Sequence, residues 1–115
     1  MSAPAEIRLR RAENRLDITF ADGATAMLPA EYLRVESPSA EVQGHGPGQK
    51  RLIAGKRHIG IGAIVPVGNY AVRLSFSDGH DTGIFTWEYL RQLGDEQAER
   101  WPAYLRAVEA AGLCR

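Results

Sequence analysis

The sequence predicts a single α+β domain over residues 1–115, with a small, mainly antiparallel sheet, short helices packed on it and a C-terminal helix. The chain is 115 residues long, which is the size of one ordinary domain. Two stretches alternate apolar and polar side chains around an Asp-Gly pair, at Asp22-Gly23 and at Asp78-Gly79, as β-hairpins with one buried face do. Each hairpin precedes residues with helical spacing, so we expect a hairpin-plus-helix unit that is used twice.

The first unit begins near the N-terminus. Residues 7–10 and 16–20 alternate in polarity and are predicted strands, and residues 25–28 form the returning arm of the hairpin. Pro29 fits the first turn of a helix, because the N–H group that proline lacks has no partner there. We therefore expect a short helix over 30–35.

Residues 37–49 are predicted to form a long loop. The glycines and prolines in this segment are too dense for a helix interior or a central strand. They are Pro38, Gly44, Gly46, Pro47 and Gly48. Because loops of more than about 12 residues are uncommon in compact domains and are often functional, this is the first place to look for a site.

The second unit continues the pattern with tighter bends. The expected elements are short strands over 51–53 and 59–65, hairpin arms over 70–76 and 82–86, a helix over 87–93 that ends at Gly94, and a C-terminal helix over about 95–111. Both units run on into Glu-Tyr-Leu-Arg, at 31–34 and at 88–91. Two explanations of this similarity are open: duplication of one hairpin-plus-helix unit, and convergence of two units on the same turn chemistry.

Charge and cysteine content exclude several classes of protein. The 14 Lys and Arg residues balance the 14 Asp and Glu residues, so no net field draws the molecule to nucleic acid or to an anionic membrane. Cys114 is the single cysteine, which excludes an internal disulfide and a cysteine-only metal site within one chain. No apolar run approaches the roughly 18–20 residues of a membrane span, and the N-terminal residues do not resemble a signal peptide. We therefore expect a cytoplasmic protein that binds neither nucleic acid nor membrane.

Two histidines in predicted turns are candidate metal ligands. His80 follows Asp78-Gly79, so an imidazole lies beside a carboxylate. His45 is flanked by glycines in the long loop. If this loop folds over the second hairpin, His45, His80 and Asp78 would form a site for zinc or another divalent metal. The alternative is a pair of surface turns in which Asp78 accepts hydrogen bonds from nearby backbone amides.

A surface that contacts a protein partner is the other candidate. Lys56-Arg57-His58 is a short basic cluster that suits an acidic partner, and it lacks the interleaved aromatic residues typical of nucleic-acid binding. Trp87 belongs either to the core or to an exposed patch. The expected contact residues are Ser37, Ser39, Gln43, Lys56, Arg57 and Trp87. No serine lies in a G-x-S-x-G turn and no phosphate-loop spacing is present, so we do not expect an enzyme.

Three strings of the sequence resemble one known family. They are LPAEYLRVESPSAEV at 28–42, VGNYAV at 67–72 and FSDGHDTGIFTWEYL at 76–90. The chain resembles the domain of unknown function 971, also called the gamma-butyrobetaine hydroxylase-like N-terminal domain. The resemblance covers about 7–93 and leaves the C-terminal helix outside it.

This resemblance implies a zinc site that has lost most of its ligands. In the hydroxylases the domain holds a structural zinc through a Cys-x-Cys-x-x-Cys cluster and a histidine of the second hairpin. The histidine matches His80, but Ser37, Ser39 and Val42 stand at the cysteine positions. A tetrahedral Cys₃His site cannot form from these residues. His45, which is near the lost cluster in sequence, is the residue that would rebuild a different site with His80.

The resemblance also implies a function. The hydroxylases carry their catalytic machinery in a separate dioxygenase domain, which a chain of this length cannot contain. The same domain resembles a segment appended to iron–sulfur cluster carrier ATPases of the Mrp type. We therefore expect a non-catalytic binding or adaptor module, accessory to iron–sulfur or metal-dependent protein maturation, with a protein partner. The alternative is a metal-binding domain that uses His45 and His80 with a nearby carboxylate.

Overall fold

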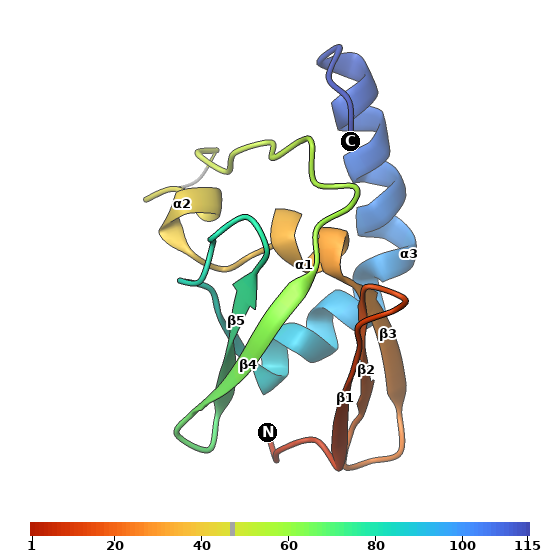
Figure 1. Ribbon diagram of the computed structural model, residues 1–115, viewed down its shortest axis with the longest axis vertical. Coiled ribbons are helices and arrows are strands. Elements are labelled where there is room, and N and C mark those ends of the chain that lie inside the picture. Colours follow the sequence, from red (N-terminus) through yellow and green to blue (C-terminus); the bar gives the residue numbers. More distant parts are fainter. Residues whose placement is uncertain (47) are drawn as a thin grey trace.

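The structure is a computed structural model that describes residues 1–46 and 48–115, and Pro47 of the predicted loop lies outside this description. In chain order the elements are β1 (Glu6–Arg10), β2 (Arg15–Thr19), β3 (Thr25–Pro29), α1 (Ala30–Val35), α2 (Ala40–Gln43), β4 (Ile61–Val67), β5 (Ala71–Phe76), β6 (Ile84–Thr86) and α3 (Trp87–Ala110). The strands form two antiparallel sheets, β1-β2-β3 and β4-β5-β6 (Figure 1). The predicted α+β class is confirmed, with the strands divided between two sheets.

Each sheet contains one of the two predicted Asp-Gly turns. Gly23 and Gly79 both have φ of +88°, a conformation that glycine adopts without steric cost. In each turn an aspartate side chain accepts a hydrogen bond from the amide two residues on, Asp22 from Ala24 at 3.1 Å and Asp78 from His80 at 3.0 Å. The two hairpins therefore have the same turn chemistry, as the sequence predicts.

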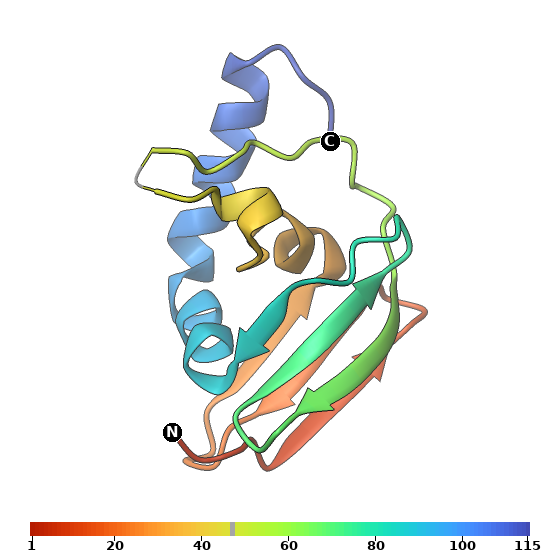
Figure 2. The same ribbon diagram turned by 90° about the vertical axis from the view of Figure 1, so that its left-hand side faces the viewer.

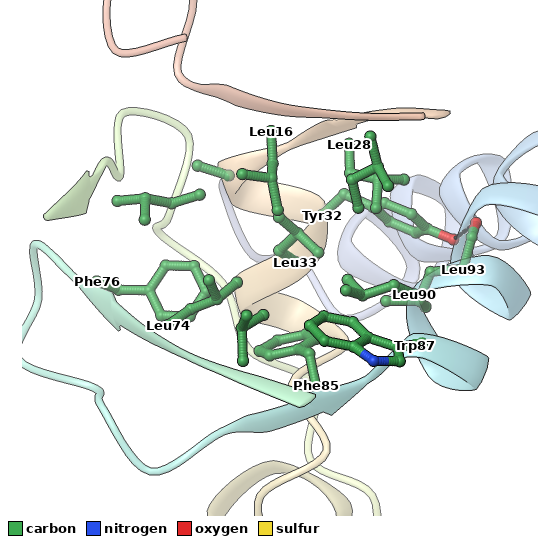
Figure 3. Close-up of a cluster of buried hydrophobic side chains, with 14 of the residues drawn as sticks. Leu16, Leu28, Tyr32, Leu33, Leu74, Phe76, Phe85, Trp87, Leu90 and Leu93 are labelled. Atoms are coloured by element: carbon green, nitrogen blue, oxygen red, sulfur yellow. Dashed lines mark hydrogen bonds between the residues drawn. The ribbon is translucent and has the colours of Figure 1, made fainter. Parts of the chain in front are cut away.

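The core lies between the sheets, and α1 fills it. Figure 3 shows Tyr32 and Leu33 of α1 between leucines of the first sheet and aromatic and leucine side chains of the second. The Tyr32 hydroxyl donates a hydrogen bond to the backbone oxygen of Leu93 at 2.6 Å, which ties α1 to α3. Trp87 is only 6% exposed and its indole N–H donates to the backbone oxygen of Asn69 at 2.9 Å. Tyr32 and Trp87 thus serve packing, with their polar side-chain atoms paired.

Helix α3 runs without a break from Trp87 to Ala110, so the predicted end at Gly94 and new start at about 95 are wrong. A Cβ atom at position 94 would lie 3.0 Å from the Cβ atom of Ala26. The glycine therefore allows a close approach between α3 and β3 and does not end the helix. Pro102 also lies inside α3, and the helix changes direction along its length (Figure 1). Among the described residues, no helix is both long and apolar enough to cross a membrane.

The predicted strand over 51–53 is also wrong, because these residues have no regular secondary structure. Their polar backbone groups bind separate parts of the chain: the Arg51 amide donates to the backbone oxygen of Val42 at 2.6 Å, and the backbone oxygen of Ile53 accepts from the Tyr104 hydroxyl at 2.7 Å. Figure 2 shows this segment running beside the C-terminal half of α3 towards the C-terminus. It is a tethered connection and not a sheet strand.

Candidate functional site

The long segment after α1 folds back onto the second hairpin. Its middle forms the short helix α2, which places Glu41 next to the turn after β5. Glu41 accepts a hydrogen bond from the Thr82 hydroxyl at 3.2 Å and contacts His80 Nδ1 at 3.1 Å. The two regions that the sequence singled out are therefore side by side.

His80 is held between two side chains of this segment. Its Nε2 lies 2.9 Å from Ser37 Oγ, and its Nδ1 lies 3.1 Å from Glu41 Oε2. Ser37 is fully buried and His80 is 6% exposed, whereas the Glu41 side chain is 63% exposed. Gly83 packs against Ser37, since a Cβ atom at position 83 would collide with the serine hydroxyl. The cluster joins the two segments across a sequence separation of about 40 residues.

The order Ser37, His80, Glu41 matches the side-chain types of a hydrolytic triad. A catalytic serine needs a path to substrate and donors that stabilise the developing oxyanion. Ser37 is closed off from solvent, and none of the three residues lines a described cavity. The arrangement fixes the fold of the segment and offers a substrate no access to the hydroxyl.

These side chains are not suited to bind the zinc ion that the resemblance implies. Ser37 and Glu41 occupy the two ring nitrogens of His80. Val42, which is fully buried, has no donor atom. Ser39 Oγ is buried and has no hydrogen-bond partner in the described part of the chain, but a neutral hydroxyl is a weak zinc ligand beside the thiolates and imidazoles of structural sites.

His45 is placed apart from this cluster. It is exposed, and its amide donates to the Gln49 side chain at 3.1 Å. Within residues 1–46 and 48–115, no three His, Cys, Asp or Glu side chains are grouped so that they could hold a metal ion. The predicted grouping of His45 and Asp78 with His80 is therefore absent from the described structure.

Asp78 is engaged by cations instead. Its carboxylate pairs with Arg34 at 2.8 Å and with Lys56 at 2.8 Å, and it is 18% exposed. Burial on its own raises the pKa of Asp78, but hydrogen bonds from Lys56, from the His80 amide and from Arg34 outweigh it and hold the pKa well below its usual range. Asp78 is thus an ionised anchor that ties the segment around Lys56 to the second hairpin.

A basic surface surrounds this anchor. Lys56, Arg57, His58, Ser77, Asp78 and Arg115 line a hollow of about 260 Å³, and we call these six residues the basic surface. Lys56 pairs with Asp78, and Arg115 pairs with Glu31 at 2.8 Å. Arg57 and His58 are exposed, and their side chains have no polar partner among the described residues. Their donors are available to a partner.

The six residues predicted to contact a partner lie in different surroundings in the structure. The predictions for Trp87 and Ser37 are wrong, because the first packs in the core and the second is fully buried. Ser39 is half-buried, and the half-buried Gln43 donates from its side chain to the backbone oxygen of Ser37 at 2.9 Å. Lys56 and Arg57 belong to the basic surface.

Two features escaped the sequence reasoning. Glu41 lies within a segment predicted to be irregular, so nothing in its neighbourhood indicated contact with His80. A larger cavity, of about 360 Å³, lies between residues 50–53 and α3. The helical spacing of Ala103, Tyr104 and Ala107 was the available signal for it.

Comparisons with known proteins agree in one family. The family model described as gamma-butyrobetaine hydroxylase-like, N-terminal, matches residues 7–91. A protein of unknown function from Acidithiobacillus ferrooxidans, assigned to the domain of unknown function 971 family, has a crystal structure that is 47% identical, with a TM-score of 0.67; the match covers 79% of this chain and 91% of that one.

Two solution structures determined by NMR are also similar. One is 44% identical with a TM-score of 0.87, and the match covers all of this chain and 90% of that one. The other is 43% identical with a TM-score of 0.85, and it covers all of this chain and 86% of that one. No curated protein matches the chain.

Proposed function

The chain belongs to the gamma-butyrobetaine hydroxylase-like N-terminal family, and from this premise we propose that it is a non-catalytic binding module whose basic surface contacts an acidic segment of a protein partner. The observation that carries the proposal is the exposed pair Arg57 and His58 beside a hollow built on the Asp78 ion pairs. The exposed Arg57 guanidinium has no polar partner among the described residues, and an unpaired cation on a formed surface favours an acidic partner.

The anchoring of this surface supports a binding role. Lys56 and Arg34 fix Asp78, while Ser37 and Glu41 fix His80 in the same turn. A surface that is already ordered loses less conformational entropy when a partner binds. The enclosed Ser37 hydroxyl supports a role without catalysis. The accessory role in iron–sulfur or metal-dependent protein maturation comes from the family resemblance, and it belongs to the proposal on that ground.

Charge reversal tests the proposal. Arg57→Glu inverts an exposed cation of the basic surface, and Arg106→Glu makes the same change at an exposed position of α3 with no polar partner among the described residues. We expect affinity capture to recover a partner with the original chain and with Arg106→Glu. With Arg57→Glu, recovery should fall about tenfold, as loss of about 1.4 kcal/mol of binding free energy implies. Equal recovery of the partner by the original chain, Arg106→Glu and Arg57→Glu would contradict the proposal.

The metal-binding alternative stays a prediction, because no contact in the described structure favours it. Titration of isotopically labelled chain with zinc, followed at the rings of His45 and His80, tests it. Saturable, coupled shifts at both rings would support a metal site. We expect the Ser37 and Glu41 contacts to leave the His80 ring without such a response.

A further inference from the structure

The cavity beside α3 is a groove with apolar walls. Its walls include Val35 from the end of α1, Leu52 and Ile53 from the irregular segment, and Ala103, Tyr104 and Ala107 from α3. Leu52 is 39% exposed, so apolar surface is open to solvent here. The volume of about 360 Å³ is within the range of small-molecule sites, about 300–1,000 Å³. The groove is large enough to hold a small ligand.

The wall opposite α3 is held in place at several points. The Tyr104 hydroxyl donates to the backbone oxygen of Ile53 at 2.7 Å, and the Gly55 amide donates to the backbone oxygen of Cys114 at 2.9 Å. The Lys50 ammonium pairs with the buried Glu36. A tyrosine hydroxyl is protonated at neutral pH, and burial raises the pKa of Tyr104 further. The groove therefore exists before any ligand binds.

The lining of the groove carries an excess of positive charge. Three cations line it, Lys50, Arg51 and Arg100, against the single carboxylate of Glu36. Glu36 is already shared between Lys50 and Arg100, whose Nη1 lies 3.1 Å away. Arg51 is exposed, and its guanidinium has no polar partner in the described part of the chain. An exposed, unpaired guanidinium presents parallel N–H donors that match the two oxygens of a carboxylate.

We propose that this groove binds a small amphipathic carboxylate, with the aliphatic body against Ala103, Tyr104 and Ala107 and the anionic head at Arg51 and Lys50. The apolar walls require a hydrophobic body, and the unpaired cation requires a negative head. The inference is independent of the proposed partner surface, because Arg57 and His58 do not line the groove.

Titration with four matched probes tests both requirements. Octanoate has chain and charge, 1-octanol has the chain alone, octylammonium has the chain with opposite charge, and acetate has the charge alone. Below the micellar concentration of the probes, we expect saturable octanoate-induced NMR shifts at the Ala103 and Ala107 methyl groups, the Tyr104 ring and the Arg51 side chain. Binding of the other three should be at least about tenfold weaker.

Two variants and their controls locate the site. Arg51→Glu should weaken octanoate binding about tenfold or more, while Arg106→Glu, at an exposed position outside the groove, should leave it unchanged. Ala107→Trp fills the groove and should abolish binding. Ala98→Trp makes the same change at an exposed position of α3 outside the groove and should preserve binding.

Three results would overturn the inference. One is 1-octanol or octylammonium binding as tightly as octanoate, which would show that the groove does not select an anion. Another is octanoate affinity that is unchanged in Arg51→Glu or in Ala107→Trp. The third is a response that never saturates or that falls mainly outside the groove.

Discussion

Gly83 determines how closely the second hairpin packs on Ser37. A Cβ atom at this position would collide with Ser37 Oγ and would lie 3.1 Å from the Phe85 ring. Both neighbours are fully buried, so neither can move away cheaply. The position tolerates no side chain without a shift of the Ser37–His80 contact.

Gly83→Ala should therefore lower the free energy of unfolding by about 1–3 kcal/mol, the usual cost of overpacking. Chemical denaturation measures this change. Gly62→Ala is the matched control, because the nearest atom to its added Cβ is the Ser75 backbone oxygen at an ordinary 3.6 Å. Equal stability of the two variants would contradict the described packing around Ser37.

The Asp78 ion pairs predict a dependence of stability on pH. The pKa of Asp78 is held below its usual range in the folded chain, so the ionised carboxylate stabilises the fold above the unfolded pKa of about 3.9. This contribution is lost as the pH falls from about 4 towards the folded pKa. Asp78→Asn should lower the free energy of unfolding by about 1–3 kcal/mol at neutral pH.

The difference between the original chain and Asp78→Asn should shrink below about pH 4. Denaturation at several pH values measures whether this stability difference shrinks as the pH falls. Asp81→Asn provides the control, since Asp81 is exposed and has no polar side-chain partner in the described part of the chain. A stability difference for Asp78→Asn that is constant down to pH 2 would be incompatible with the described ion pairs.

Among the elements, the irregular segment over 50–55 depends on side-chain tethers. In the described part of the chain no strand pairs with its backbone in a regular ladder, and the Tyr104 hydroxyl supplies one of its hydrogen bonds. Tyr104→Phe should lower the free energy of unfolding by about 0.5–1.5 kcal/mol. It should also speed amide exchange over 51–54.

Tyr70→Phe is the matched control for this prediction. Tyr70 is 51% exposed, and its hydroxyl has no hydrogen-bond partner among the described residues, so the change should leave both measurements unaltered. Amide exchange over 51–54 that is the same in Tyr104→Phe and Tyr70→Phe would show that the tether does not hold the groove wall.

Local patterns in the sequence were sufficient for the hairpins and α1. The Asp-Gly turns and the period-2 alternation depend on residues close in sequence, so they could be read without the tertiary structure. Gly94 was misread as a helix end because its role depends on Ala26 of β3. Residues 51–53 were misread as a strand, because no strand in the described part of the chain pairs with them. At Gly94 and at residues 51–53, tertiary contacts override the secondary-structure preference of the local sequence.

The candidate site was predictable only in part for the same reason. The predicted site depended on the condition that the long loop folds over the second hairpin, and this condition is met, as the Ser37–His80 and Glu41–His80 contacts show. The choice of His45 as the partner of His80 was wrong, because the path of the segment brings Glu41 there. Spacing along a sequence does not reveal which residue of a long loop contacts the hairpin.

At the scale of the whole molecule, the two sheets enclose α1 and the segment over 50–58 crosses the outside. This segment contributes Lys50 to Ile53 to the groove and Lys56 to His58 to the basic surface. Arg57→Glu should weaken partner capture and leave octanoate affinity unchanged. Arg51→Glu should weaken octanoate binding. Loss of both properties in both variants would show that the two surfaces are not separate.

Site-specific photocrosslinking in cells tests the partner surface without knowledge of the partner. A photoreactive phenylalanine analogue at position 57 lies on the basic surface, and the same analogue at position 106 of α3 lies outside it. We predict a discrete crosslinked protein from position 57 and none from position 106, with the crosslink weakened at high salt because exposed charges are screened. The same crosslinked proteins at both positions, or none at position 57, would contradict the proposed binding surface.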